Sequence, residues 1–264
     1  TLDTILFFSD RGKVYASKAH EIPEANRTDR GTPAINILAL EATERITAAV
    51  AVHSFDQASY CTLATVRGRI KRVELSEFAS VRPSGLIAMG LDKGDELGWA
   101  RLTSGKDDIM LITADGHALR MVEKSVRSMG RPASGVTGIA LKPGDRLTSM
   151  EVVEPGGSLL VVTEFGHGKQ TRLEEYSAKG RATSGVATID QHSLDKIGKI
   201  AAARVVQPTD EVTLISSGGQ MLRIKVSQIS SSGRATRGVR LMGIQPGDSI
   251  ASVARIPAEV VLEG

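Results

Sequence analysis

The sequence predicts an all-β fold of the β-pinwheel or propeller-like kind, with five four-stranded antiparallel blades. Two observations predict it: a pattern of strand, glycine turn and strand occurs five times, and an arginine and glycine signature follows each turn at a nearly fixed distance. A period near 50 residues indicates that each repeat is one supersecondary unit. Radial repetition of four-stranded sheets leaves only short, protected sheet edges.

The first motif is an apolar strand, a tight turn and a second strand that usually carries cations. It reads FFSDRGKVYASK, LATVRGRIKRVE, LITADGHALRMV, VVTEFGHGKQTR and LISSGGQMLRIK along the chain. The turn glycines are separated by 56, 48, 50 and 53 residues, and they are Gly12, Gly68, Gly116, Gly166 and Gly219. At the third turn, Asp115 and Gly116 favour a two-residue hairpin of the primed type, because glycine accepts a positive φ without a Cβ clash.

The second motif follows each turn glycine. An arginine lies 14 or 15 residues past the turn, and another glycine follows three or four residues later. The arginines are Arg27, Arg82, Arg131, Arg181 and Arg234, and the glycines are Gly31, Gly85, Gly135, Gly185 and Gly238. These spacings divide a single repeat domain, residues 1–264, into repeats at about 4–55, 59–104, 108–154, 158–207 and 211–257.

Each repeat is expected to supply four strands. In the third repeat, alternation and β-branched residues between turn signals predict strands at 109–113, 118–122, 136–141 and 147–153. No segment shows sustained helical periodicity with caps, so helix is expected to be negligible.

The cations are concentrated around the two motifs. The windows 10–31, 66–85, 114–135, 164–185 and 217–238 hold 22 cations and 11 anions, whereas the rest of the chain holds 11 cations and 19 anions. If the repeats are radial, these cations lie at the same place on every blade and form a stripe. A stripe suits a polyanion whose phosphates are neutralised without sequence reading. Duplex DNA fits better than a single strand, because aromatic residues make up only 3% of the chain.

The candidate DNA-binding residues are cations of these two motifs. They are Arg69, Lys71, Arg72, Arg120, Lys169, Arg172, Arg223 and Lys225 after the turn glycines, and Arg131, Arg181, Arg234 and Arg237 in the second motif. For the arginines of the second motif an alternative stays open, because a five-donor guanidinium also suits a structural loop whose backbone carbonyls it bonds. A cation on an outer strand can also be a solvated residue that prevents aggregation.

No catalytic or metal site is expected. The histidines lie in different segments, and the single cysteine, Cys61, cannot form a disulfide within these residues or a multi-thiolate metal site. No apolar run approaches the roughly 20 residues that span a bilayer, so a cytoplasmic protein is expected. The segment Gly166 to Thr171 is only faintly similar to a phosphate-binding loop, because Gln170 stands where serine or threonine is required.

Three strings carry a resemblance to a known family: FFSDRGKVYASKAHEIPEANRTDRGTPAINILALEATERITA, SVRSMGRPASGVTGIAL and GRATRGVRLM. They resemble the C-terminal domain of the A subunit of bacterial DNA gyrase, one of the type IIA topoisomerases, and the similarity runs through all five repeats. It implies a β-pinwheel that bends duplex DNA around a basic perimeter and serves negative supercoiling. It also implies, as partners, double-stranded DNA, the gyrase B subunit, and the remainder of the gyrase A subunit.

The resemblance implies that catalysis lies elsewhere in the parent enzyme, which would use ATP and Mg, and that this domain binds no cofactor. Tyr15, Tyr60 and Tyr176 lack the arginine and carboxylate setting of the family's cleavage tyrosine. We interpret them as strand or packing residues.

One hallmark of the family, the box QRRGGKG, does not occur in this sequence. The box resembles one copy of the second motif, and its lysine position is occupied by a cation only at Arg30 and Arg237, with Ser134 and Ser184 in the third and fourth repeats. The family normally has six blades with the box in the first, and TLDTILFF resembles the start of the second. The regularity of the five repeats favours truncation over loss of the first blade. DNA bending is still expected, and full wrapping stays open.

Three other functions compete with this hypothesis. The equivalent domain of topoisomerase IV can lack the box, although its repeats are generally more degenerate. A propeller that binds a protein partner would need no shared basic stripe, which the charge distribution disfavours. A propeller enzyme would need a set of histidines and carboxylates around a channel, and no such set recurs in the repeats.

Overall fold

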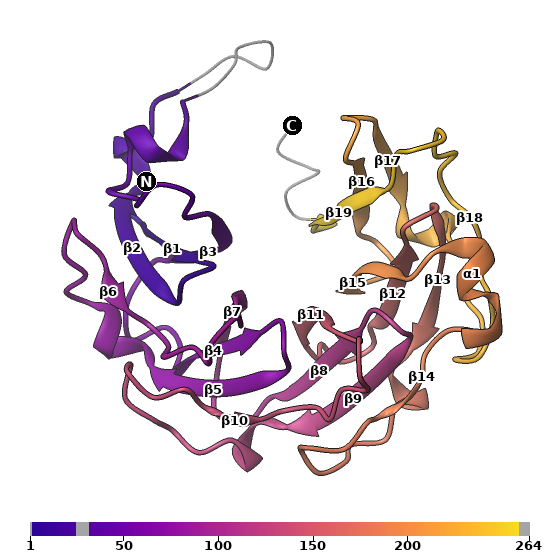
Figure 1. Ribbon diagram of the computed structural model, residues 1–264, viewed down its shortest axis with the longest axis horizontal. Helices are drawn as coiled ribbons and strands as arrows, with labels where there is room; N and C mark the ends of the chain where they lie inside the picture. The colour runs from indigo at the N-terminus through magenta and orange to yellow at the C-terminus, as the bar shows by residue number, and fades with distance from the viewer. Residues whose placement is uncertain (1, 25–31, 259–264) are drawn as a thin grey trace. The chain divides into compact units, whose positions relative to one another are not determined.

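The computed structural model describes residues 2–24 and 32–258 (Figure 1). The chain forms two compact units, one of residues 1–106 with 124–138 and the other of residues 107–123 with 139–264. Antiparallel strands dominate, and the only α-helix in the described residues is the four-residue α1 (Leu194–Ile197). The 3₁₀ turns are η1 (Ala19–Glu21), η2 (Ala34–Asn36), η3 (Leu75–Phe78), η4 (Glu123–Ser125), η5 (Leu173–Glu175), η6 (Gln191–Ser193) and η7 (Val226–Gln228). The predicted all-β class is confirmed.

The first unit contains two four-stranded sheets. The first sheet has the strand order β3-β1-β2-β6, and the second has the order β10-β5-β4-β7. The strands are β1 (Thr4–Ser9), β2 (Lys13–Lys18), β3 (Ile46–Val52), β4 (Tyr60–Thr65), β5 (Arg69–Glu74), β6 (Leu86–Ile87), β7 (Leu97–Thr103) and β10 (Val136–Thr137).

The second unit contains the other three sheets. Their strand orders are β11-β8-β9-β14, β15-β12-β13-β18 and β17-β16-β19. The strands are β8 (Asp108–Thr113), β9 (His117–Val122), β11 (Leu147–Val152), β12 (Ser158–Thr163), β13 (His167–Arg172), β14 (Val186–Ala187), β15 (Ile200–Val206), β16 (Glu211–Ser216), β17 (Met221–Lys225), β18 (Val239–Arg240) and β19 (Ile250–Ile256).

The outer strand of each four-stranded sheet comes from the following repeat (Figure 1). Strand β10 of the third repeat, for example, pairs with β5 of the second over two residues only. The next amide, that of Gly138, donates to the carbonyl oxygen of the turn glycine Gly68 at 2.8 Å, where β5 begins. The prediction of a third-repeat strand over 136–141 is therefore wrong, because the strand is shorter and belongs to the second sheet.

The fifth sheet has three strands in the described residues, instead of the predicted four. Within residues 2–24 and 32–258, β17 pairs with no short outer strand like the one beside the equivalent strand of the other sheets. As a result Met221 is 67% exposed, whereas the equivalent Ile70 of β5 is 0% exposed.

The hairpin turns differ from the predicted primed type. Each turn glycine donates its N–H to the carbonyl oxygen three residues earlier, as Gly116 does to Thr113 at 3.2 Å. Gly116 has a φ of +88°, but Asp115 is not left-handed. The turn is therefore a three-residue loop in which only the glycine takes a positive φ. The hydroxyl of Thr113 also accepts the N–H of His117 at 3.3 Å. The equivalent hydroxyls of Ser9, Thr65, Thr163 and Ser216 accept in the same way.

Each apolar cluster packs between two neighbouring sheets of one unit. In the first unit, Leu6 and Phe8 of β1 pack with Leu63 of β4 and Leu97 of β7. Phe8 meets Phe78 of η3 edge to face, with ring centroids 5.9 Å apart. Two further clusters lie between the third and fourth sheets and between the fourth and fifth. Each fully buried large apolar side chain contributes about 1.5–3 kcal/mol relative to exposure, so the repeats depend on their neighbours for stability.

Three glycines of the second motif allow the short outer strand of one repeat to pair with the sheet of the preceding repeat. Gly135, Gly185 and Gly238 have φ values of +76°, +73° and +77°. A Cβ at these positions would lie 2.5, 2.3 and 2.6 Å from a carbonyl oxygen of the preceding repeat. The incoming chain thus rests directly on the backbone of the preceding hairpin, and only glycine satisfies both the close approach and the positive φ.

We expect Gly185→Ala to destabilise the fold more than Gly247→Ala. Both positions have a positive φ, which costs an alanine about 1–2 kcal/mol. Only at Gly185 would the new Cβ also meet the carbonyl oxygen of Ala118, whereas nothing lies within 4 Å at Gly247. The clash should add about 1–3 kcal/mol. Thermal or denaturant unfolding of the two variants measures the difference, and equal losses would contradict this role for Gly185.

Candidate nucleic-acid interface

Several cations after the turn glycines hold the neighbouring repeat instead of facing solvent. Arg69 at the start of β5 donates from Nε to the carbonyl oxygen of Ser134 at 3.0 Å and from Nη2 to that of Gly135 at 2.8 Å. It also lies 3.5 Å from the carboxylate of Asp92. Arg69 therefore anchors the incoming segment of the third repeat at the second-motif glycine.

Lys71 and Lys169 are fully buried, with 0% of each residue exposed. The Lys71 ammonium donates to the carbonyl oxygens of Gly130, Arg131 and Ala133 at 3.0, 2.5 and 3.0 Å. Burial lowers the pKa of both lysines to about 8. The prediction that these two lysines contact DNA is wrong, because neither has accessible surface and the ammonium of Lys71 is bonded to three backbone carbonyls.

The position four residues past the turn glycine has a related role. Arg72 is 9% exposed and lies over the ring of Tyr60, with 4.4 Å from the guanidinium carbon to the ring centroid. Arg120 bonds Asp108 at 2.8 Å and the carbonyl oxygen of Leu173 in η5 at 3.1 Å. Both guanidinium groups are thus engaged inside the fold, and the prediction that Arg72 and Arg120 form an outer track is not supported by their surroundings.

Gln170 occupies the place of Arg120 one repeat later. Its side-chain amide donates to the carbonyl oxygens of Val226 and Ile229 at 3.1 and 2.8 Å, around η7. A neutral amide therefore does what the arginine does, which identifies the position as structural.

The arginines of the second motif are more accessible. Arg181 and Arg237 are exposed, and Arg131 and Arg234 are partly exposed. The guanidinium of Arg131 lies 3.6 Å from the Glu77 carboxylate. The sequence left open that these arginines hold the loops. In the third and fifth repeats, Lys71 and Lys169 bond the carbonyl groups of these loops. Arg27, Arg30 and Gly31 of the first repeat lie outside the described residues.

Three further candidates lie on second strands, Arg172 and Lys225 at the strand ends and Arg223 in the middle of β17. Arg172 and Lys225 are exposed. The Arg223 guanidinium pairs with Glu211 of the same hairpin and keeps 54% of its side chain exposed. All three remain accessible to a polyanion.

Besides the exposed Arg82, four exposed cations near the second motif were not among the candidate DNA-binding residues. Lys124 and Arg127 follow β9, Lys179 follows η5, and Arg240 is on β18. Lys124, Arg127 and Lys179 stand inside the basic windows of the sequence, so the local excess of cations could have identified them. We define the exposed loop cations as Lys124, Arg127, Lys179, Arg181, Arg237 and Arg240.

The remaining chemistry-bearing residues have structural surroundings. The hydroxyl of Tyr15 donates to the Glu44 carboxylate at 2.9 Å, and the hydroxyl of Tyr176 lies 2.5 Å from that of Thr188. Both tyrosines are 1% exposed, and burial raises the pKa of each phenol. Among the described residues no group of three histidine, cysteine or carboxylate side chains could hold a metal ion.

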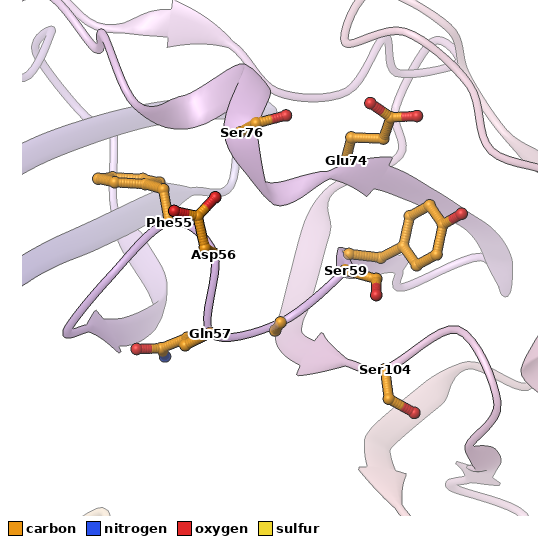
Figure 2. A pocket seen from close by; sticks show the side chains of 9 residues that line it. Phe55, Asp56, Gln57, Ser59, Glu74, Ser76 and Ser104 are labelled. Carbon is orange, nitrogen blue, oxygen red and sulfur yellow. The ribbon is translucent and has the colours of Figure 1, made fainter.

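A pocket of about 440 Å³ lies beside the second sheet (Figure 2). Its ionisable side chains include the carboxylates of Asp56, in the loop before β4, and Glu74, at the end of β5. Phe55, Gln57 and three serines complete much of the lining. This acidic pocket does not suit a phosphate-bearing ligand, so the candidate interface is the set of loop cations. In the described residues no helix is long and apolar enough to cross a membrane.

Five segments of the chain match one protein family. The family described as DNA gyrase C-terminal domain, beta-propeller, matches residues 3–53, 60–104, 107–154, 157–207 and 210–257. The chain belongs to this family. It is 41% identical over 257 residues to the A subunit of DNA gyrase from Mycolicibacterium smegmatis and 50% identical over 256 residues to that from Halalkalibacterium halodurans. Each alignment covers 97% of this chain but 30% of the relative, so the chain spans less than a third of these proteins.

Solved structures of the same fold agree with this family. The crystal structure of the C-terminal domain of DNA topoisomerase IV matches with a TM-score of 0.88 and 28% identity, covering 98% of this chain and 80% of that chain. The structure of a DNA gyrase A C-terminal domain matches with a TM-score of 0.86 and 26% identity, covering 97% and 83%. The resemblance to the gyrase A family is confirmed, and the fold is shared with topoisomerase IV.

We expect Arg120→Met to destabilise the fold, whereas Arg172→Met leaves it nearly unchanged. The first variant removes the bonds to Asp108 and to the carbonyl of Leu173, which leaves half-buried acceptors unpaired and costs about 1–3 kcal/mol. The second removes an exposed cation of the following repeat and should stay within about 0.5 kcal/mol. Denaturant unfolding measures both changes. A neutral Arg120→Met would show that Arg120 is not structural.

Proposed function

We propose that this domain binds and bends duplex DNA without reading its sequence, using the exposed loop cations, the partly exposed Arg131 and Arg234 of the same loops, and Arg172, Arg223 and Lys225 of the second strands. The observation that carries the proposal is the placement of Arg131, Arg181 and Arg234 at the same accessible loop in successive repeats. Phosphates are the groups that such cations neutralise, with release of counterions.

The described surface favours a duplex over a single strand. Large aromatic side chains such as Phe8, Tyr15, Phe78 and Tyr176 are buried, and among the described residues Phe165 is the only aromatic among the exposed large hydrophobic side chains. Proteins that bind single strands without sequence preference stack successive bases on exposed aromatic rings. Cations without stacking platforms instead contact the sugar-phosphate backbone, which positions DNA but carries no sequence information directly.

The function of the parent protein is part of the same proposal. The matching relatives from both organisms are A subunits of DNA gyrase. In such a parent, this domain would present bent DNA to a cleavage core that supplies the catalytic residues, with ATP and Mg used outside this domain. Its partners would be duplex DNA, the gyrase B subunit, and the remainder of the gyrase A subunit, in the bacterial cytoplasm.

A second candidate is the corresponding domain of topoisomerase IV. The TM-score of 0.88 to a topoisomerase IV domain, beside 0.86 to a gyrase A domain, favours keeping it. A circular-DNA assay separates the two. A gyrase-type domain is expected to constrain supercoils in a relaxed circle at stoichiometric protein, whereas a domain that only binds DNA would leave the linking number unchanged after relaxation.

We expect affinity for duplex DNA to fall steeply with salt. If roughly 6 to 10 phosphates are neutralised, affinity should drop about 10³ to 10⁵-fold between 50 and 200 mM salt. Fluorescence anisotropy with two duplexes of equal length and unrelated sequence measures the slope and the sequence preference together. A flat salt response, or a strong preference for one duplex, would point to another mode of binding.

Charge reversal tests which cations carry the DNA. Arg181→Glu combined with Arg237→Glu should weaken binding to every duplex and lower the salt slope, because both side chains are exposed in second-motif loops. The matched control is Lys106→Glu combined with Lys142→Glu, which changes the net charge equally at exposed sites outside the basic windows. Similar losses in both variants would indicate a general charge effect and contradict the loop interface.

A further inference from the structure

Two buried lysines lie directly beneath the loops that expose second-motif arginines. Lys71 donates to the carbonyl oxygens of Gly130 and Arg131, and Lys169 donates to those of Gly233 and Arg234, the equivalent pair. In both cases the acceptors are the arginine itself and the glycine before it. The ammonium thus fixes the backbone from which the arginine side chain leaves.

The third bond of each ammonium differs, yet it secures the same loop. Lys71 reaches the carbonyl oxygen of Ala133 at 3.0 Å. Lys169 instead reaches the hydroxyl of Thr171 at 3.2 Å, and that hydroxyl donates to the carbonyl oxygen of Ser232 at 2.8 Å. All the donors of an ammonium are needed to saturate these acceptors.

The same position in other repeats shows what the lysine adds. Three residues past the turn glycine stand Tyr15, Lys71, Leu119, Lys169 and Leu222. Tyr15 and Leu119 are buried like the lysines, but Leu119 has no donor, and the Tyr15 hydroxyl bonds Glu44 instead of a loop. A buried apolar residue is therefore sufficient for packing, and the lysine is not required by the fold alone.

We propose that Lys71 and Lys169 are positioning residues for DNA binding, which act by holding Arg131 and Arg234 in place without touching DNA. This inference rests on the proposed function. Under this proposal, the arginines of the third and fifth repeats are held in place by a lysine. The loops that contain Arg82 and Arg181 differ, because Tyr15 and Leu119 stand at the lysine position.

The first test measures the loops themselves. In Lys71→Met, hydrogen exchange of residues 128–134 should accelerate at least severalfold while residues 231–237 keep the wild-type rate. Lys169→Met should give the reverse, so each variant is the control for the other. Methionine fills the buried space without a charge to desolvate, so both variants are expected to fold. Unchanged exchange in both loops would overturn the proposal, even if the wild-type chain did not bind DNA.

The second test measures the coupling to DNA. Each phosphate contact contributes about 0.9 to the slope of log affinity against log salt, or about 3.5-fold in affinity between 50 and 200 mM. Lys71→Met and Arg131→Gln should each remove about one contact, and the double variant should remove no more than either alone. Additive losses would mean that the buried charge acts directly on DNA, and an unchanged slope would mean that the loop is not part of the interface. Either result overturns the proposal.

A third test needs no substitution. Burial lowers the pKa of both lysines to about 8, opposed by Glu77 and Cys61 around Lys71 and by Glu175 around Lys169, while Arg131 and Arg234 lower it further. A neutral amine has two N–H groups for three acceptors, so the salt slope should be smaller at pH 9.5 than at pH 7. In the two Met variants combined this difference should disappear. A wild-type slope that is the same at both pH values would count against the proposal.

Unfolding of the domain would not explain a loss of DNA affinity at high pH. The folded pKa lies below the ordinary value of 10.5, so the unfolded chain binds more protons between about pH 8 and 10.5. Raising the pH through this window therefore increases the contribution of these lysines to the free energy of unfolding. Loss of DNA affinity together with maintained thermal stability is the signature expected of loop positioning.

Discussion

The close approach of one backbone to the next is the contact on which the second, third and fourth sheets depend. At Gly185 the incoming chain lies so near the Ala118 carbonyl that a Cβ would be 2.3 Å from its oxygen. The same approach recurs at Gly135 and Gly238. Because the two-residue outer strands follow these glycines directly, the glycines determine where each repeat joins the one before it. The arginine four residues earlier is thereby placed at a fixed distance from the preceding hairpin.

This arrangement explains why cations occur both inside and outside the fold. A loop that crosses a hairpin turns several carbonyl groups toward the protein, and buried carbonyls must be hydrogen bonded. Arg69, Lys71 and Lys169 meet that requirement from below. The arginines of the loops remain partly or fully exposed. A basic stripe in the sequence is consequently two populations of side chains, one buried and one accessible to solvent.

The period, the all-β class and the glycine positions could be predicted because each reflects a local requirement that has one solution, such as a positive φ. The pairing of β10 with β5 of the preceding repeat could not be predicted, because a strand of only two residues, Val136 and Thr137, carries no information about its partner. The turn type was also wrong, although the serine or threonine three residues before each turn glycine signals the observed loop. The charge of the basic windows predicted an outer track for the cations of β5, but β5 is buried on both faces.

A comparison between repeats would have placed the buried lysines correctly. At the position three residues past the turn glycine, tyrosine and leucine occupy three of the five repeats, which indicates an interior site. A lysine at an interior site is costly unless its charge is paired or hydrogen bonded, so its presence there requires acceptors nearby. For Lys71 and Lys169 these acceptors are backbone carbonyl oxygens of the next repeat's second motif. Interior lysines in a basic repeat thus indicate loops whose backbone is hydrogen bonded from the inside, and in the proposed interface they would hold Arg131 and Arg234 in place.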